Sequence, residues 1–297
     1  MRRAGFKRTM SVHGYTRAGH KYPENHDRRT ATTSDPPIRN EAGLSSGQPL
    51  FGTADVAGAL EIGFASSAVV EKTNEDCFGV VTPQEMPEAV ERGIAVAVAD
   101  GGSSAGTGRV ASELTVRTLL QDFYSTPARW SVERAIDTVL CSVNDWLYVQ
   151  NGRDPDLDGI VSTLSMMLFD RGNFHLAHVG DTRVYRRRAG VLDRLTVDHT
   201  WPRRDMRHVL RRAVGLDSHL VIDFFSGETN VDDVFLIASD GVWEVLGNKV
   251  VDELLGSEHS SESIARELVD LSVKNQRRYM GHNDATALVI RIVGTGR

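Results

Sequence analysis

Acidic residues stand directly after apolar segments at several points in this sequence. Asp100 follows the apolar run 94–99, and Asp240 follows the run 234–238 after a single serine. Short runs of this kind are typical of fully buried β-strands. A carboxylate at the end of such a strand lies at the rim of the core, where it is partly desolvated and needs a cation. We therefore interpret Asp100 and Asp240 as catalytic, metal-binding acids.

The same arrangement recurs elsewhere in the chain, which favours a site built from several strand ends. Further oxygen ligands stand near the ends of other apolar segments: Asp76, Asp181, Asn283 and Asp284. Gly101 has no side chain to block the site, so its backbone carbonyl can approach the same cation. Clusters of oxygen ligands suit Mg²⁺ or Mn²⁺ better than Zn²⁺. The pattern predicts a hydrolytic site with several metal ions.

Short strands and paired helices are expected to position these acids. Helical spacing of apolar residues predicts helices at 110–124 and 131–150, which should pair, and two more at 250–255 and 264–273. Alternating or apolar runs predict strands at 60–64, 74–81, 94–99, 162–169, 174–179, 183–188, 191–195, 220–225, 234–238 and 285–293. The first two strands are expected to form a hairpin, and those from 162 to 195 a meander. This grouping predicts an α+β fold, sheet on sheet with helices outside.

The composition limits the classes of function. The chain has 297 residues, 40% of them hydrophobic, and no apolar run long enough to span a bilayer. Its two cysteines cannot form a disulfide framework, which favours a cytoplasmic location. The net charge is −6, yet residues 1–50 carry nine Lys and Arg against four Asp and Glu. The remaining chain is therefore strongly acidic, which argues against nucleic-acid binding.

The first part of the chain differs from the rest in pattern as well as in charge. Residues 1–55 show neither helical nor alternating periodicity and are rich in Arg, Ser, Thr, Pro and Gly. We interpret them as a disordered basic N-terminal tail and residues 56–297 as one folded domain that carries the acidic motifs.

The acidic motifs and their order resemble those of the bacterial metal-dependent serine/threonine protein phosphatases of type 2C. The matching motifs are Asn74-Glu75-Asp76, Ala99-Asp100-Gly101, Ser162-Thr163, Val179-Gly180-Asp181-Thr182-Arg183, Asp198-His199, Ala238-Ser239-Asp240-Gly241-Val242-Trp243 and Asn283-Asp284-Ala285-Thr286. They cover about residues 60–293. The motif Asp100-Gly101-Gly102-Ser103-Ser104 and the aromatic residues near Trp130 and Trp146 are most similar to the phosphatase half of bifunctional kinase/phosphatase proteins.

The resemblance implies a central antiparallel β-sandwich flanked by pairs of α-helices, in four layers α-β-β-α. It implies two or three Mn²⁺ or Mg²⁺ ions at one end of the sandwich. Asp100 would bridge two ions, the Gly101 carbonyl would bind one of them, and Asp181 would bind the third. Asp240 and the pair Asn283 and Asp284 would hold the other ion, and Asp76 and Glu75 would bind directly or through water. The resemblance thus makes residues 56–297 a metal-dependent phosphatase domain.

The implied activity is hydrolysis of phosphoserine and phosphothreonine in proteins by a metal-activated water, with no protein nucleophile. The implied partners are phosphoprotein substrates and a cognate serine/threonine kinase, with neither nucleic acid nor membrane involved. The implied location is the cytoplasm.

Three positions depart from the family pattern. Glu71 stands where the family has a phosphate-binding Arg, so Lys72 and Arg207 are the candidate substrate-binding cations. Ala105 replaces a His proposed as a general acid, and Asn283 replaces a ligand Asp. The alternative function is therefore a pseudophosphatase, a regulatory binding module that recognises a kinase or a phosphoprotein without turning it over.

Overall fold

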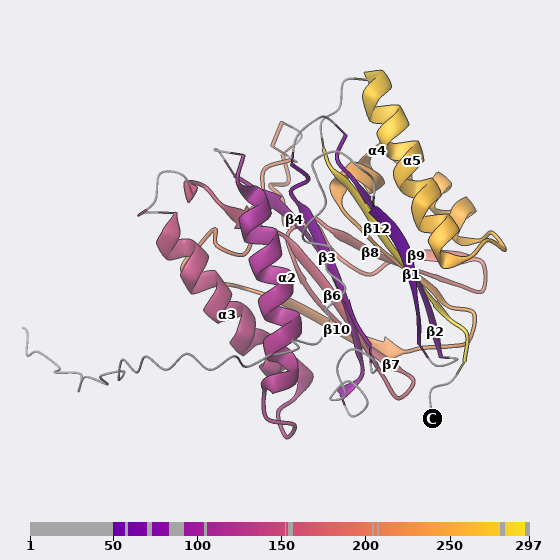
Figure 1. Cartoon of the computed structure of the whole chain (residues 1–297), viewed down its shortest axis with the longest axis horizontal. Coiled ribbons are helices and arrows are strands. Elements are labelled where there is room, and N and C mark those ends of the chain that lie inside the picture. The colour runs from indigo at the N-terminus through magenta and orange to yellow at the C-terminus, as the bar shows by residue number, and fades with distance from the viewer. Residues whose placement is uncertain are drawn as a thin grey trace, which may run out of the picture. The chain divides into compact units, whose positions relative to one another are not determined.

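The computed structural model describes residues 50–56, 59–69, 73–82, 92–103, 106–151, 153, 157–203, 205–206, 208–279 and 283–294. In this part of the chain, strands form two antiparallel sheets and helices cover their outer faces (Figure 1). The predicted α+β sandwich is confirmed.

The first sheet has the strand order β1-β2-β12-β11-β8-β9, and all neighbouring strands in it are antiparallel. Its strands are β1 (Leu50–Val56), β2 (Leu60–Ser67), β8 (Arg183–Arg188), β9 (Val191–Arg194), β11 (Val234–Ala238) and β12 (Ala285–Ile292). The neighbouring strands β11 and β12 each have one end next to an acidic residue of the predicted site.

The second sheet has the order β10-β7-β6-β4-β3, with the short β5 also paired to β4. Its strands are β3 (Asp76–Val81), β4 (Ile94–Gly102), β5 (Val161–Ser162), β6 (Leu164–Asp170), β7 (Asn173–Val179) and β10 (Asp223–Glu228). Neighbouring strands in this sheet are also antiparallel.

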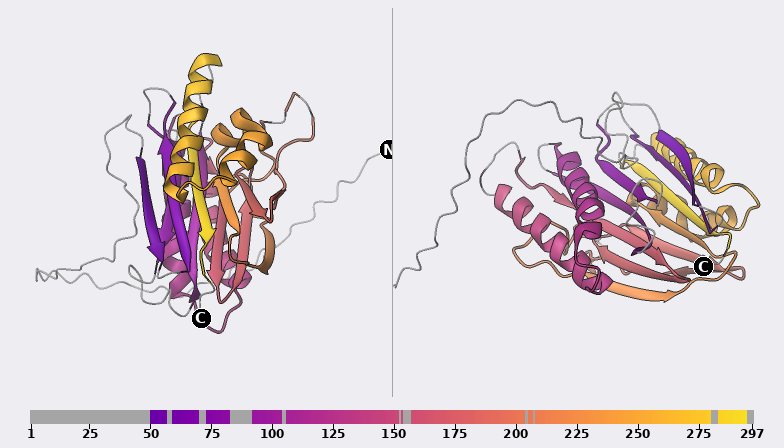
Figure 2. Two further views of the ribbon diagram at one scale, coloured as in Figure 1. Left: turned by 90° about the vertical axis from the view of Figure 1, so that its right-hand side faces the viewer. Right: turned by 60° about the horizontal axis from the view of Figure 1, so that its bottom comes forward.

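Two pairs of helices enclose the sandwich. The helices are α2 (Gly108–Ser125), α3 (Val132–Gln150), α4 (Asp240–Leu255) and α5 (Ser261–Tyr279). Helices α2 and α3 lie together on one side of the strands, and α4 and α5 lie on the other, as the turned views of Figure 2 also show. Ser131 caps α3 as predicted, because its side chain accepts a hydrogen bond from the Arg134 N–H.

Three hydrophobic clusters correspond to the three interfaces between the four layers. In β4 the alanines 95, 97 and 99 pack in the cluster with α2 and α3, whereas Val96 and Val98 pack between the sheets. In β12 the alternation is the same, since Val289 belongs to the cluster with α4 and α5 and Leu288 to the cluster between the sheets. Both strands are buried on both faces, which explains their continuous apolar sequences.

Two pairing predictions are wrong. The strands at 60–64 and 74–81 do not form a hairpin, because β2 pairs with β1 and β12 whereas β3 pairs with β4. The predicted meander is interrupted, because β7 and β8 belong to different sheets. Alternation along a strand indicates which side chains face a core, but it does not indicate which strand lies next to it.

The predicted boundary at residue 55 lies too late in the chain. Strand β1 begins at Leu50 and pairs with β2 along its whole length, so the last residues assigned to the tail belong to the first sheet. Residues 1–49 lie outside the described part of the chain. None of the helices in the described part is both long enough and apolar enough to cross a bilayer.

Candidate metal centre

Five aspartates from five strand ends lie at one end of the sandwich. Two belong to the second sheet itself: Asp76 begins β3, and Asp100 lies directly opposite it in β4. Asp181 follows β7 after a single glycine, Asp240 begins α4 after β11, and Asp284 immediately precedes β12. The site therefore draws on both sheets, as the positions of the acids in the sequence predict.

Hydrogen bonds fix the backbone and side chains of the two acids on the second sheet. The Asp100 N–H donates to the Thr163 hydroxyl at 2.8 Å, and the Ser239 hydroxyl donates to the Asp76 carboxylate at 2.8 Å. The Thr286 N–H in turn donates to the Ser239 hydroxyl at 2.9 Å. Asp76 on the second sheet is thus tied to the junction of β11 and β12 in the first.

The turn before β12 directs Asp284, rather than Asn283, into the acidic cluster. Asp284 is buried and accepts a hydrogen bond from the Glu75 N–H at 2.8 Å. Asn283 is exposed, and its side-chain amide donates to the Asp240 carboxylate at 2.8 Å. In this arrangement Asn283 orients a neighbouring acid, and Asp284 presents the carboxylate.

Gln276 of α5 holds this turn in place. Its side chain binds the Asn283 backbone in both directions, accepting from the N–H at 2.9 Å and donating to the carbonyl at 2.8 Å. It also donates to the Gly241 carbonyl at 3.1 Å. The sequence analysis assigned no role to Gln276, because only the folded chain brings α5 next to the turn.

Two glycines permit close backbone contacts beneath the site. A Cβ at Gly101 would overlap the backbone of Gly108 at the start of α2, and a Cβ at Gly241 would overlap the Asp284 carbonyl. The Glu75 carboxylate accepts from the Gly108 N–H at 2.7 Å. The acidic side chain of Glu75 therefore caps α2, and the Asp-Gly pairs of the sequence reflect close packing as well as ligand access.

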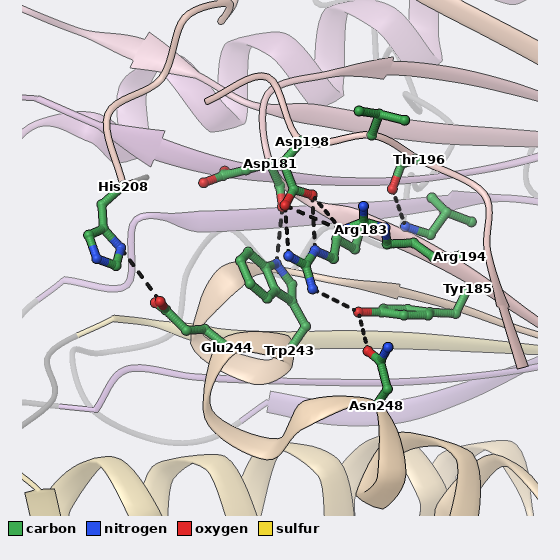
Figure 3. Close-up of polar contacts among 12 residues, drawn as sticks. Asp181, Arg183, Tyr185, Arg194, Thr196, Asp198, His208, Trp243, Glu244 and Asn248 are labelled. Atoms are coloured by element: carbon green, nitrogen blue, oxygen red, sulfur yellow. Dashed lines mark hydrogen bonds and ion pairs between the residues drawn. The ribbon is translucent and has the colours of Figure 1, made fainter. Parts of the chain in front are cut away.

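Asp181 is held by a network that joins β8 to α4 (Figure 3). The Trp243 indole N–H donates to the Asp181 carbonyl at 3.0 Å, and the Arg183 guanidinium stacks on the Trp243 ring. Arg183 also makes a bidentate ion pair with Asp198, at 2.9 and 2.7 Å. Sequence motifs contained these residues but gave no indication of their contacts.

The carboxylates raise one another's pKa values. Burial raises the pKa of Asp100 well above its usual range, and the charges of the other four aspartates raise it further. Burial also raises the pKa of Asp76, with Asp284 and Asp240 adding to the effect and the Ser239 hydrogen bond opposing it. Asp100 therefore lies within electrostatic range of all four other aspartates.

The remaining acids show the same perturbation. Burial, followed by the charges of Asp240 and Asp198, raises the pKa of Asp181 to about 7. Burial, followed by the charge of Glu244, raises the pKa of Asp240 to about 6. Such a cluster stabilises protons or cations and disfavours the bare charged form.

The residues present fit a centre of hard divalent cations. The buried Oδ1 atoms of Asp76 and Asp240 accept no hydrogen bond from any group that the structure describes. Within the described ranges, no three His, Cys, Asp or Glu side chains are arranged to hold one ion by themselves. Mg²⁺ and similar ions usually bind one or two carboxylates and keep several waters, so spaced carboxylates around a shared centre match that requirement.

Some predicted site residues cannot be placed. Lys72, Arg207, Glu71 and Ala105 lie outside the described residues. His199 of the Asp198-His199 motif is buried, and its ring nitrogens contact the Gly180 N–H at 3.1 Å and Asp223 at 2.9 Å. These contacts give it a structural role beneath the Asp181 turn.

Clustered carboxylates at the end of a four-layer sandwich form a site suited to hard divalent cations. Residues 69–281 match the model of the family Protein phosphatase 2C. The chain belongs to this family, which confirms the type 2C resemblance and makes the chain a metal-dependent serine/threonine phosphatase. The finer likeness to kinase-fused relatives stays a prediction.

Curated relatives carry matching names. The chain is 26% identical over 213 residues to the serine/threonine phosphatase stp of Listeria monocytogenes serotype 4b, covering 66% of this chain and 83% of that protein. It is 27% identical over 212 residues to the serine/threonine protein phosphatase PstP of Mycobacterium tuberculosis, covering 67% of this chain and 40% of that protein.

Solved structures share the fold. The catalytic domain of PstP, determined in complex with two manganese ions, superposes with a TM-score of 0.65 at 24% identity and covers 80% of this chain and 99% of that one. PppA, described as a key regulatory component of T6SS in Pseudomonas aeruginosa, superposes with a TM-score of 0.65 at 26% identity, covering 81% of this chain and all of that one.

Proposed function

We propose that this chain removes phosphate from phosphoserine and phosphothreonine in partner proteins, using Mn²⁺ or Mg²⁺ held by Asp76, Asp100, Asp181, Asp240 and Asp284. The observation that carries the proposal is the convergence of these five carboxylates, since the charges of the other four all raise the pKa of Asp100. When bound, such ions lower the pKa of water and neutralise phosphoryl oxygens during in-line attack.

The protein's own contribution is to hold ligands rigidly. Thr163 fixes the Asp100 backbone, and Ser239 orients the Asp76 carboxylate. The Gly101 carbonyl remains a candidate ligand beside Asp100. Because both residues of this pair lie in β4, which is buried on both faces, the geometry is set before substrate arrives.

His208 is our candidate proton donor for the leaving serine or threonine oxygen. Its Nδ1 lies 3.5 Å from the Glu244 carboxylate, and its side chain is 60% exposed. Glu244 lies one turn after Asp240 in α4, and its charge contributes to the raised pKa of Asp240. Figure 3 shows the contact between His208 and Glu244. An exposed imidazole can reach a substrate oxygen and exchange its proton with solvent, whereas His199 is buried.

The substrate phosphate would be bound by Lys72 and Arg207, as the sequence predicts, beside the acidic centre. A cognate serine/threonine kinase and a cytoplasmic location also belong to this proposal. The support for the kinase is the family membership, and the support for the location is that the two cysteines are free.

The pseudophosphatase alternative rested on three departures from the family pattern. The placement of Asp284 weakens one of them, because a carboxylate enters the cluster although Asn283 occupies the family's ligand position. The other two departures concern Glu71 and Ala105. A direct assay of turnover decides between the two functions.

The test is hydrolysis of a phosphothreonine peptide by the full chain with Mn²⁺, with Mg²⁺ and with chelator. We expect turnover that depends on the metal, that Zn²⁺ restores poorly, and that is lost in Asp100→Asn. The matched control is Asp252→Asn, the same chemical change at a half-exposed acid paired with Arg187. Metal-independent turnover, or none with either ion, would contradict the proposal.

A further inference from the structure

Two acids of the metal centre come from separate segments of the chain, and contacts between these segments help to set the relative position of the acids. Asp181 lies on the turn after β7, and Asp240 lies at the start of α4. Gly247 has a non-helical backbone with φ of 71°, so it interrupts α4 and separates the first two turns from the remainder. The position of Asp240 is therefore not fixed by the long part of its helix.

Trp243 connects the two segments. It lies one turn after Asp240, and its indole N–H donates to the Asp181 backbone carbonyl at 3.0 Å. The bond joins the short first segment of α4 directly to the turn that carries Asp181. In Figure 3 the indole ring points from α4 toward the Asp181 backbone.

Arg183 and Asp198 hold the indole ring in this orientation. The Arg183 Cζ lies 3.3 Å from the centre of the Trp243 ring, and the same guanidinium binds both Asp198 oxygens. A guanidinium can stack and form a bidentate ion pair at once, which an ammonium cannot do. Arg183 also donates to the Tyr185 hydroxyl at 3.2 Å, so its orientation is fixed from three sides.

We propose that Trp243, Arg183 and Asp198 form a positioning clamp that sets the separation of Asp181 from Asp240, and with it the affinity of the metal position that Asp181 serves. The inference rests on the proposed metal centre. None of the three clamp residues is offered as a ligand. Partners of metal ligands typically alter metal affinity by about 10–100-fold when they are removed, and the clamp falls in that class.

Strand β8 and helix α4 are also joined at a second place, which provides a control. Arg187 of β8 and Asp252 of α4 form an ion pair at 2.9 Å, on the far side of the Gly247 kink. This pair ties β8 to α4 as the clamp does, but it touches neither metal-binding segment. If the contacts between β8 and α4 served only to stabilise the fold, removing the clamp and removing the Arg187–Asp252 pair should change Mn²⁺ affinity equally.

The experiment is a calorimetric titration of metal-free protein with Mn²⁺. Trp243→Phe keeps an aromatic ring under Arg183 but removes the N–H donor. We expect one Mn²⁺ binding step, that of the position Asp181 serves, to lose about tenfold or more in affinity while the remaining binding is unchanged. Excess Mn²⁺ should restore kcat, and Arg183→Lys should behave in the same way, whereas Asp252→Asn should match the wild type.

Equal titrations for Trp243→Phe and wild type, or equal weakening in Asp252→Asn, would overturn the clamp. Should Trp243→Phe fold poorly, the milder Arg183→Lys decides the matter, with thermal unfolding of the metal-free proteins as the measure of folding. Phosphopeptide hydrolysis by the wild type is measured separately from Mn²⁺ binding. A wild type that binds Mn²⁺ without turnover would refute the proposed function and leave the clamp to the titrations, while a wild type that binds no Mn²⁺ would refute both.

Discussion

Removing the charge of Asp181 should change how the stability of the metal-free protein depends on pH. The pKa of this acid is about 7 in the folded chain against 3.8 in an unfolded one. A raised pKa means that the folded state holds the proton more tightly. The resulting stabilisation is fully present below pH 3.8 and is lost as the pH rises through about 7.

The size of the effect follows from the shift. Between pH 5 and pH 8 Asp181 alone should remove about 3 kcal/mol from the free energy of unfolding, at 1.36 kcal/mol per pKa unit. For a domain of this size that corresponds to roughly 5–10 °C in Tm. Asp240, with a pKa of about 6, adds a smaller loss of the same sign. The variant Asp181→Asn has no titrating group at this position, so it should lack the larger part of this pH-dependent loss of stability.

The assay is thermal unfolding of wild type and Asp181→Asn in chelator from pH 5 to pH 8. Burial lowers the pKa of His178 to about 4, so this residue destabilises the protein as the pH falls below 6.5 and opposes the Asp181 trend. The difference between the two proteins at each pH cancels that contribution. Saturating Mn²⁺ should reverse the wild-type trend, because metal competes with protons for the same oxygens. Parallel curves in chelator would refute the reasoning.

Further outcomes are expected at individual positions. Asp240→Asn should abolish Mn²⁺-dependent hydrolysis without lowering the Tm of the metal-free protein at pH 8, because it removes one of several repelling charges. Gly241→Ala should cost about 1–3 kcal/mol in denaturant unfolding, because its Cβ would overlap the Asp284 carbonyl. His208→Gln should lower kcat for phosphothreonine peptide by about 100-fold but barely affect aryl phosphate, whose leaving group needs no proton; equal losses would exclude a proton donor. If Lys72 and Arg207 bind the phosphate as proposed, Glu71→Arg should barely change KM for aryl phosphate, and Lys72→Ala or Arg207→Ala should raise it about tenfold or more. A KM about tenfold lower in Glu71→Arg would mean instead that position 71 faces a phosphate that lacks a cation.

Local sequence patterns predicted most of the strands and helices and singled out the acids at strand ends, but they missed β1 and the first part of α4. The run 94–99 is apolar because β4 is buried on both faces, and that property is visible in the sequence itself. Strand pairing was not predictable in the same way, since β2 and β3 alternate alike yet join different sheets. Tertiary contacts, rather than local periodicity, decide which strand lies next to which.

In the site, too, residues marked by local patterns were predictable, whereas contacts between distant segments were not. Asp76 and Asp100 were identified from their positions at strand ends, and they face each other in the structure. The contacts of Gln276 and Trp243 were not predictable, because each joins segments far apart in the chain and neither residue type is specific to metal sites. The choice between Asn283 and Asp284 depended on the course of one turn, which no spacing rule specifies.

The hydrogen bond between the Glu75 N–H and Asp284 joins residues 209 positions apart. During synthesis, a ribosome will have released four of the five acids before the last one emerges. The nascent chain therefore cannot complete the metal centre until Asp284 has left the exit tunnel and β12 has entered the first sheet. Each molecule can therefore become catalytically active only late in its synthesis. A chain cut short before this turn would have no complete metal centre.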